Sequence, residues 1–298
     1  QRTMDTIRLK ALAKINIGLD VLRRREDGYH DVKMIMQTVG IYDQICLNRE
    51  KTPGIRVKTN LFYLPDNENN LVYKAAKLLM DEFSIEDGVS IDLNKYIPVA
   101  AGMAGGSSDA ASVLYGMNKM FSLGLSQDEL MRRGVKIGAD VPYCIMRGTA
   151  LAEGIGEILT PLPPMPACFV LVAKPGISVS TKFVYENLHA NDLRPEQHPD
   201  IDAAIAGIRA GDLKATAQAM GNVLELVTAR EYPVIEEIKN FMKKRGALNA
   251  MMSGSGPTVF GLFENKTTAR NAFYQLRRTN HAKQVYLTEI YNNRRQRV

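Results

Sequence analysis

Apolar and polar residues alternate along the first part of the chain, and this alternation predicts β-strands. Residues 7–11 and 15–19 each place every second side chain in an apolar position, and a β-rich run follows at 32–39. Successive side chains of a strand point to opposite faces, so the pattern suits a sheet with a buried face. The polar segment 23–30 contains Asp27-Gly28, which is typical of a turn.

Apolar residues three and four positions apart predict the first helix, which follows Asn70. A strand is expected at 89–93, and the glycine-rich segment after it opens a helix of about four turns that reaches Met120. The capping box Ser126–Glu129 begins another helix, which runs to about Ile137 and ends at Gly138. Strands are expected at 149–152 and 157–160.

A proline-rich segment, residues 161–166, holds four of the chain's 13 prolines. Proline lacks an N–H donor and has a fixed φ, so neither a ladder nor a helix continues through it. We therefore expect two domains, 1–163 and 164–298. The elements expected in the second are a buried strand at 168–173, helices around 180–189, 200–220 and 232–245, a glycine turn into a strand at 258–263, a helix near 267–278 and a strand at 284–290. Without strict βα alternation, the mixture indicates an α+β fold.

Composition narrows the class of protein. The 298 residues are 45% hydrophobic and 23% charged, which is typical of a soluble globular protein and excludes a disordered or fibrous chain. The net charge of +6 is small for this length and suits anionic small molecules at least as well as nucleic acid. Part of it lies at the tail (Arg294, Arg295, Arg297), for which a solvated terminus is the simpler interpretation.

The cysteines and histidines indicate no disulfide framework and no zinc site. Cys46, Cys144 and Cys168 are odd in number and far apart, and no His-x-x-x-His pair occurs. The longest apolar runs fall short of the ~20 residues of a membrane helix, and the first residues lack the apolar core of a signal peptide. We expect a cytoplasmic protein with no membrane or nucleic-acid partner.

The segment 98–111 is the most informative part of the chain. Three glycines and three alanines within residues 100–106 stand between a predicted strand and a predicted helix. Glycines let the backbone approach an anion closely, and the first N–H groups of a helix point at it unpaired. Ser107 and Ser108 add hydroxyl groups that could donate to an anion or reach a metal ion. A tight turn with a serine N-cap is the simpler alternative, but it needs fewer small residues.

Neither of two common phosphate motifs fits the glycines. The loop lacks the Gly-Lys-Ser/Thr ending of a Walker loop. The dinucleotide pattern G-x-G-x-x-G fails at Gly254-Ser255-Gly256 and at Gly154-Ile155-Gly156, where the sixth positions are Val259 and Leu159. If the 98–111 segment binds phosphate, it therefore does so with neither a Walker loop nor a dinucleotide-binding motif.

Five motifs in register give the chain a resemblance to the GHMP small-molecule kinases over nearly its whole length. They are Ala13-Lys14-Ile15-Asn16, Asp27-Gly28-Tyr29-His30, Gly105-Gly106-Ser107-Ser108-Asp109-Ala110-Ala111, Gly138-Ala139-Asp140-Val141-Pro142 and Ser253-Gly254-Ser255-Gly256. The resemblance implies a mixed-sheet N-terminal nucleotide-binding domain and a smaller α/β-sandwich C-terminal domain. It also implies ATP and Mg²⁺ as cofactors, and a monomer or homodimer.

The resemblance assigns the catalytic roles. Asp140 would orient the acceptor hydroxyl and take its proton, with Lys14 beside it to counter charge on the transferring group. A carboxylate is a weak base toward an alcohol, so proton transfer should come late. From sequence alone, a strand-face lysine with its head in water and a turn aspartate are the simpler readings. Asp109 reads as structural unless it helps to hold Mg²⁺.

The resemblance also implies the ligands. The residues expected to bind ATP are Pro98, Ala101, Gly102, Met103, Ala104, Gly105, Gly106, Ser107 and Ser108. The acceptor would be a cytidine diphosphate alcohol built on methylerythritol, from the non-mevalonate route to isoprenoid precursors. Tyr29 and His30 would hold cytosine, Thr181 and Tyr185 would close over it from one helix face, and Asn16 would lie near the methylerythritol. Ser253, Gly254, Ser255 and Gly256 would border the phosphate path, although a plain turn is equally compatible.

The chain departs from the family pattern at Ala100, Ala101 and Ala104, where glycine is usual, and at Leu12, where proline is frequent. An alanine methyl group is tolerable where φ is negative. The closest phosphate contacts are then expected at Gly102, Gly105 and Gly106. We expect the three alanines to affect the affinity for ATP rather than the type of reaction. Three alternatives remain. They are a GHMP kinase for homoserine or mevalonate, a serine hydrolase of amidase type using the 105–108 serines with Lys14 as base, and a basic nucleic-acid binder.

Overall fold

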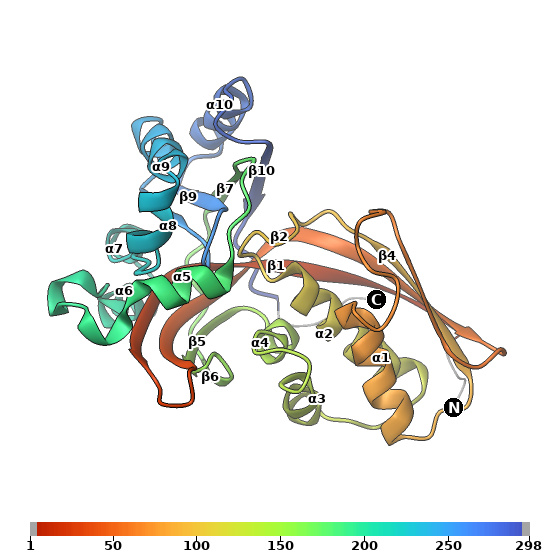
Figure 1. The fold of residues 1–298 in the computed structure, drawn as a ribbon. Helices are drawn as coiled ribbons and strands as arrows, with labels where there is room; N and C mark the ends of the chain where they lie inside the picture. Colours follow the sequence, from red (N-terminus) through yellow and green to blue (C-terminus); the bar gives the residue numbers. More distant parts are fainter. Residues whose placement is uncertain (1–4, 294–298) are drawn as a thin grey trace.

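The structure is a computed structural model that describes residues 5–293, and the basic tail residues lie outside this range. It contains two β-sheets with helices packed on them (Figure 1). The strands are β1 (Thr6–Arg24), β2 (His30–Glu50), β3 (Ile55–Thr59), β4 (Gly88–Asn94), β5 (Thr149–Gly154), β6 (Ile158–Pro161), β7 (Phe169–Lys174), β8 (Asn249–Met252), β9 (Val259–Phe263) and β10 (Gln284–Glu289). The helices are α1 (Leu71–Glu82), α2 (Gly105–Met120), α3 (Gln127–Gly134), α4 (Val141–Met146), α5 (Thr181–Leu188), α6 (Ile201–Arg209), α7 (Leu213–Gln218), α8 (Glu225–Glu231), α9 (Val234–Lys244) and α10 (Lys266–Arg277), with 3₁₀ turns η1 (Ala190–Asp192) and η2 (Pro195–Gln197).

The first sheet is mixed, as expected, in the order β3-β4-β2-β5-β6 with β1 paired to β2. Only β3 and β4 run parallel. The strands expected at 7–11 and 15–19 are one long strand, β1, whose antiparallel pairing with β2 places Lys14 opposite Thr38. Helix α2 packs on β1 and β2, and α1, α3 and α4 surround it.

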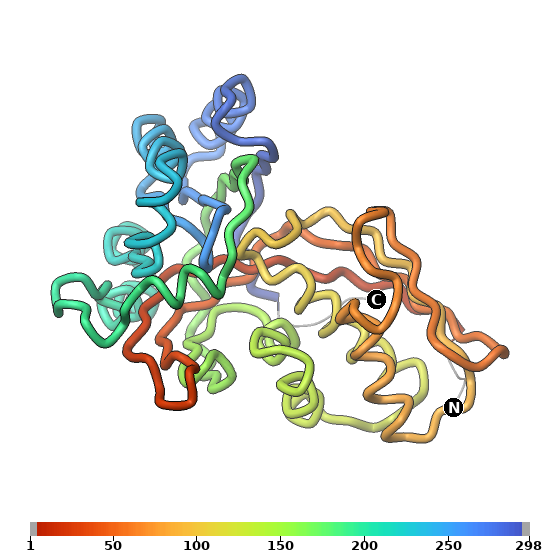
Figure 2. Tube along the Cα trace, in the orientation of Figure 1, coloured from red at the N-terminus to blue at the C-terminus, as the bar shows by residue number. Residues whose placement is uncertain are grey.

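The second sheet is antiparallel, in the order β10-β7-β9-β8, with α9 and α10 packed on it. Figure 2 follows the last strand, in dark blue, back to the red and orange strands of the first sheet. Val39 and Ile290 form an antiparallel bridge there, and Leu19 of β1 pairs with Asn222 of the second half. The α+β class with a mixed sheet and a smaller second sheet is therefore confirmed.

One hydrophobic cluster joins the two halves. Ala13, Ile15 and Ile17 on one face of β1 are fully buried, and they share a cluster with Val170 and Phe260 of the second sheet. Because side chains alternate along a strand, Lys14 and Asn16 face the opposite side of β1. All strands of the first sheet precede residue 162 and those of the second follow residue 168, while the boundary at 163/164 stays a prediction.

Several expected elements differ from the structure. Helix α3 has its predicted Ser126 capping box but ends at Gly134, and turn hydrogen bonds follow it to Gly138. The helix expected over 200–220 is two helices, because Gly211 takes a positive φ and Asp212 caps a new helix. The sequence patterns did not predict the strands β3 and β8, the helices α4 and α8, or the 3₁₀ turns η1 and η2. In the described residues, no helix is long and apolar enough to cross a membrane.

Candidate active site

Strand β1 presents Lys14 and Asn16 to a cavity between the two halves. The Lys14 side chain is only 5% exposed, so the reading of a strand-face lysine with its head in water is wrong. Its Nζ donates to Asn16 Oδ1 at 2.7 Å, and its backbone N–H donates to the carbonyl of Met103 at 3.1 Å. Burial lowers the pKa of the Lys14 ammonium below its ordinary value, and the negative charge of Asp140 opposes that shift.

Asp140 stands at the start of a helix, α4, that the sequence patterns did not predict. It is the N-cap residue of α4, and Pro142 lies in the first turn, where a missing N–H costs nothing. The carboxylate of Asp140 does not cap the helix. It lines the same cavity as Lys14 instead. The fold thus brings the expected acid and ammonium to one place.

The glycine loop presents backbone amides at the start of α2. Ala104 is the N-cap residue and has no side-chain cap, and the first intrahelical bond runs from the Ser108 N–H to the Ala104 carbonyl. The N–H groups just before it have no helical partner and suit an anion. The simpler alternative, a serine N-cap, is therefore wrong.

Two alanines of this loop are left-handed. Ala100 has φ +51° and Ala104 has φ +54°, so our expectation of a negative φ is wrong at these two positions, while Ala101 is not left-handed. A left-handed alanine costs about 1–2 kcal/mol relative to glycine. Neighbouring contacts hold the loop in this form: the Ala101 carbonyl accepts from Thr258 N–H at 3.3 Å, and the Met103 carbonyl accepts from Lys14.

The two serines of the loop have different surroundings. Ser108 is 2% exposed, and its hydroxyl donates to the Leu12 carbonyl at 2.7 Å. Ser107 is half-buried beside Gly138, where an added Cβ would lie 3.9 Å from the Ser107 hydroxyl. With Lys14 bonded to Asn16 and Ser108 to Leu12, the structure shows no Ser–Lys dyad at Ser108, which disfavours the amidase alternative.

The turn 253–256 packs directly on the glycine loop. Ser253 Oγ donates to the Gly102 carbonyl at 2.9 Å, and the Gly254 N–H donates to Asn16 Oδ1 at 2.9 Å. A Cβ on Gly102 would stand 2.2 Å from the Ser253 carbonyl oxygen, and Gly102 has φ +84°. The turn therefore depends on glycine at 102.

We expect Gly102→Ala to destabilise the protein by at least about 2 kcal/mol and to raise KM for ATP, because the new methyl clashes with the turn and strains φ. Denaturant unfolding and steady-state kinetics measure both. Gly106→Ala is the matched control for stability, since a Cβ there meets only the end of the Leu71 side chain at 3.6 Å. Equal stability of the two variants would contradict the prediction.

The cavity that holds Lys14 and Asp140 has a volume of about 610 Å³, and we call it the acceptor cavity. Its lining includes every residue expected to bind the acceptor: Asn16, Tyr29, His30, Thr181 and Tyr185. The His30 and Tyr185 rings lie 5.1 Å apart at 55°, while Tyr29 is 60% exposed. Thr181 and Ser255 share a hydrogen bond of 2.8 Å between their hydroxyls.

Burial also shifts the titration of the ring pair. Burial and then the charge of Arg24 lower the pKa of His30, which leaves its imidazole neutral at neutral pH. Burial, with the charge of Asp140 second, raises the pKa of the Tyr185 phenol. Both rings are thus uncharged near neutral pH, and a neutral imidazole can both donate and accept a hydrogen bond.

A second pocket of about 220 Å³ opens on the other side of the glycine loop, and we call it the nucleotide pocket. Of the residues predicted to bind ATP, Pro98, Gly105 and Gly106 line this pocket, whereas Gly102 and Ala104 line the acceptor cavity. The sequence analysis missed its other wall, which is formed by Leu64, Pro65, Asn69, Asn70, Leu71 and Lys95. No motif marks these residues, because residues 64–71 and Lys95 lie apart in the sequence and only the fold brings them together.

Lys95 is held by two buried carboxylates at the wall of this pocket. Its Nζ lies 2.6 Å from Asp43 Oδ2 and 2.8 Å from Asp109 Oδ2. Burial works against the charge, but Asp109 and Asp43 outweigh it and raise the pKa of Lys95. Asp109 therefore holds Lys95 at the wall of the pocket.

Comparison with known proteins identifies the family. The GHMP kinases N-terminal domain matches residues 70–148 and the GHMP kinases C-terminal domain matches residues 204–282. A 4-diphosphocytidyl-2-C-methyl-D-erythritol kinase of Lachnospira eligens is 58% identical over 97% of this chain and 99% of its own length. The enzyme of the same name from Lachnoclostridium phytofermentans is 55% identical over 98% of this chain and 99% of its own.

Solved structures agree on the fold. A crystal structure of 4-(cytidine 5'-diphospho)-2C-methyl-D-erythritol kinase superposes with a TM-score of 0.82 at 31% identity, over 96% of this chain and 100% of that one. Homoserine kinase from Cytophaga hutchinsonii has a TM-score of 0.79 at 20% identity, over 97% and 95% of the two chains, and so shares the fold alone. Identity above one half over nearly the whole length decides between these relatives, and the chain belongs to the GHMP kinases, in the family of the 4-diphosphocytidyl-2-C-methyl-D-erythritol kinases.

Proposed function

We propose that this protein transfers the γ-phosphoryl group of ATP to the 2-hydroxyl of 4-diphosphocytidyl-2-C-methyl-D-erythritol, a step of the non-mevalonate route to isoprenoid precursors. One observation carries the proposal: a single cavity holds both the Lys14–Asp140 pair and the His30–Tyr185 ring pair. A molecule with a flat base at one end and an alcohol at the other fits this arrangement. The names of the full-length relatives support the same acceptor.

Phosphoryl transfer needs positioning and positive charge more than covalent work by the protein. The free amides at the start of α2 would bind the triphosphate, with its adenosine in the nucleotide pocket on the outer side of the loop. Asp140 would orient the acceptor hydroxyl and take its proton as the bond to the leaving group loosens. The Lys14 ammonium, fixed by Asn16, would counter the negative charge that gathers on the transferring group.

The residues around the loop also fit Mg²⁺. Among the described residues, no three His, Cys, Asp or Glu side chains are placed together so that they could bind a metal ion. Mg²⁺ in kinases does not need such a group, because one or two protein oxygens hold it together with phosphates and waters. The half-buried Ser107 hydroxyl at the start of α2 is an oxygen of this kind. A bound Mg²⁺ would neutralise charge on the β- and γ-phosphates.

A coupled assay of ADP release tests the acceptor. We expect turnover with 4-diphosphocytidyl-2-C-methyl-D-erythritol and at least ~10²-fold less with mevalonate or homoserine, which offer no base to the aromatic end of the cavity. The Asp140→Asn variant serves as the blank for contaminating ATPases. Preferred phosphorylation of mevalonate or homoserine would overturn the assignment.

We expect Tyr185→Leu to raise KM for the cytidine acceptor about tenfold, because stacking of a base on an aromatic ring contributes about 1–3 kcal/mol. KM for ATP should stay within about twofold, since Tyr185 does not line the nucleotide pocket. Tyr185→Phe keeps the ring and should behave as the wild type. An unchanged acceptor KM in Tyr185→Leu would remove this residue from the binding site.

A further inference from the structure

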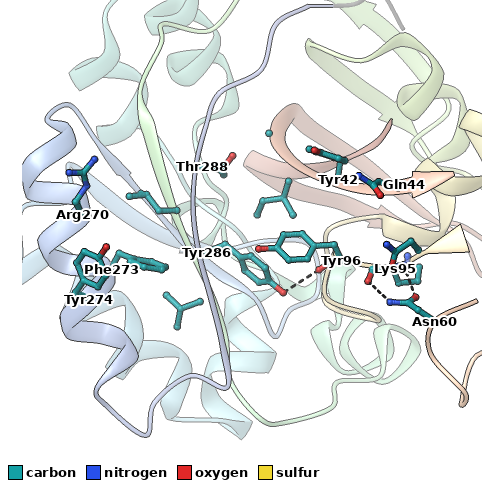
Figure 3. A pocket seen from close by; sticks show the side chains of 15 residues that line it. Tyr42, Gln44, Asn60, Lys95, Tyr96, Arg270, Phe273, Tyr274, Tyr286 and Thr288 are labelled. Atoms are coloured by element: carbon teal, nitrogen blue, oxygen red, sulfur yellow. Dashed lines mark hydrogen bonds between the residues drawn. The ribbon is translucent and has the colours of Figure 1, made fainter. Parts of the chain in front are cut away.

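A third hollow, of about 820 Å³, lies where the two sheets meet and belongs to neither pocket above (Figure 3). We call it the aromatic groove. Its walls come from β2, from the Lys95–Tyr96 segment, from α10 and from β10. It shares only Lys95 with the nucleotide pocket and no residue with the acceptor cavity. Its volume is within the ~300–1,000 Å³ of small-molecule sites.

Aromatic rings from four parts of the chain, β2, the Lys95–Tyr96 segment, α10 and β10, surround the groove. Tyr96 and Tyr286 meet edge to face at 5.2 Å, and the Tyr286 hydroxyl donates to the Tyr96 carbonyl at 3.2 Å, as Figure 3 shows. Phe273 and Tyr274 form a second edge-to-face pair on α10, at 5.3 Å. Tyr96 is 61% exposed and Tyr274 is 51% exposed. Exposed ring faces at this density suit a planar aromatic ligand.

The charge of the groove favours an anion. Lys95 and Arg270 are its only charged lining residues within the described chain, and neither Asp nor Glu lines it. Asp43 and Asp109 both pair with the Lys95 ammonium, so Lys95 adds no free positive charge to the groove. Arg270, on the exposed side of α10, has no ion pair or hydrogen bond to another described residue, so its guanidinium is available to a carboxylate or phosphate.

The groove is tied to the glycine loop through one short segment. Asn60 clamps Lys95 with two hydrogen bonds, from its Nδ2 to the Lys95 carbonyl and from the Lys95 N–H to its Oδ1. Asp43 Oδ1 accepts from the N–H groups of Tyr96 and Ile97 at 2.6 and 2.8 Å. Pro98 and the loop follow directly. A ligand that shifts Tyr96 would therefore also shift the start of the glycine loop.

We propose that the aromatic groove is a second binding site, for a small planar aromatic molecule with one anionic group, and that its occupancy changes the affinity of the nucleotide pocket. The coupling rests on the proposed function of that pocket, whereas the binding does not. A protein inactive on the cytidine acceptor would still bind the aromatic anion, so the two proposals fail separately.

Fluorescence titration with 1-anilinonaphthalene-8-sulfonate tests the binding on the full chain. We expect saturable binding that Arg270→Ala weakens at least about fivefold, since the variant loses the charged hydrogen-bond donor that would pair with the anion. Arg278→Ala is the matched control: it removes the same charge from the C-terminal end of α10, outside the groove, and should stay within twofold. Tyr274→Leu should weaken binding as well. No saturation, or equal affinity in Arg270→Ala and wild type, would overturn the site.

Two further measurements complete the test. Displacement of the dye by phenyl phosphate or by benzoate identifies which anion the site prefers, and displacement by neither contradicts the proposal. A non-hydrolysable ATP analogue should change the dye affinity at least about threefold without displacing it, because coupling between two sites is reciprocal. Complete displacement would place the dye in the nucleotide pocket and overturn the proposal. An unchanged affinity would overturn the coupling.

Discussion

An Asp140→Asn enzyme is expected to turn over at least ~10²-fold more slowly than the wild type, because the amide cannot take the proton of the acceptor hydroxyl. Binding of a non-hydrolysable ATP analogue should change little, since Asp140 lines the acceptor cavity and not the nucleotide pocket. Steady-state ADP release and calorimetric titration measure the two effects.

Asp128→Asn is the matched control for this variant. Asp128 is exposed in the first turn of α3, away from both pockets, and it is not the capping residue. Its loss should leave turnover unchanged. Wild-type turnover in Asp140→Asn would remove the carboxylate from the mechanism, and a matching loss of nucleotide affinity would assign it to binding instead.

A Lys14→Met enzyme should lose at least ~10²-fold in turnover as well, because the ammonium that counters charge on the transferring group is gone. Its thermal stability should be equal to or higher than that of the wild type, since an ammonium that is 5% exposed is costly to bury. This second readout separates chemistry from folding. Lys10→Met, an exposed lysine on the same strand, is the control and should keep full activity.

The pH profile gives an independent check on Lys14. Burial lowers the pKa of Lys14 below its ordinary value. As the pH rises, Lys14 therefore loses its proton, and its positive charge, at a lower pH than an ordinary lysine does. We expect kcat/KM to fall on an alkaline limb below pH 10.5, the ordinary lysine value. In Lys14→Arg the residual activity should lack this limb, because guanidinium stays charged. A limb unchanged by Lys14→Arg would assign it to another group.

The sequence motifs pointed to side chains that the structure brings together at one cavity, although several helices and strands were not predicted. The glycine loop, Lys14 and Asp140 could be found because each motif is local and keeps its order along the chain. Helix α4 was missed because it is six residues long and contains Pro142. The left-handed Ala100 and Ala104 could not be foreseen either, since contacts from Thr258 and Lys14 hold that loop.

The wall of the nucleotide pocket was beyond sequence reasoning for a different reason. Leu64, Asn70 and Lys95 have no shared spacing, and only the packing of α1, β4 and α2 brings them together. The strand β3 did carry a signal: Ile55 and Val57 alternate with polar residues after Gly54. In contrast, the ion pairs of Lys95 join residues 14 and 52 positions apart, which no periodicity encodes.

The side-chain amide of Asn16 links the catalytic lysine to the second half of the chain. Its single oxygen accepts both from the Lys14 ammonium and from the Gly254 backbone of the second half. Without the Gly254 N–H, this oxygen would keep only the Lys14 ammonium as a donor, and the Lys14 side chain would be less firmly positioned. The position of the Lys14 ammonium in the first half therefore depends on a hydrogen bond that comes from the second half of the chain.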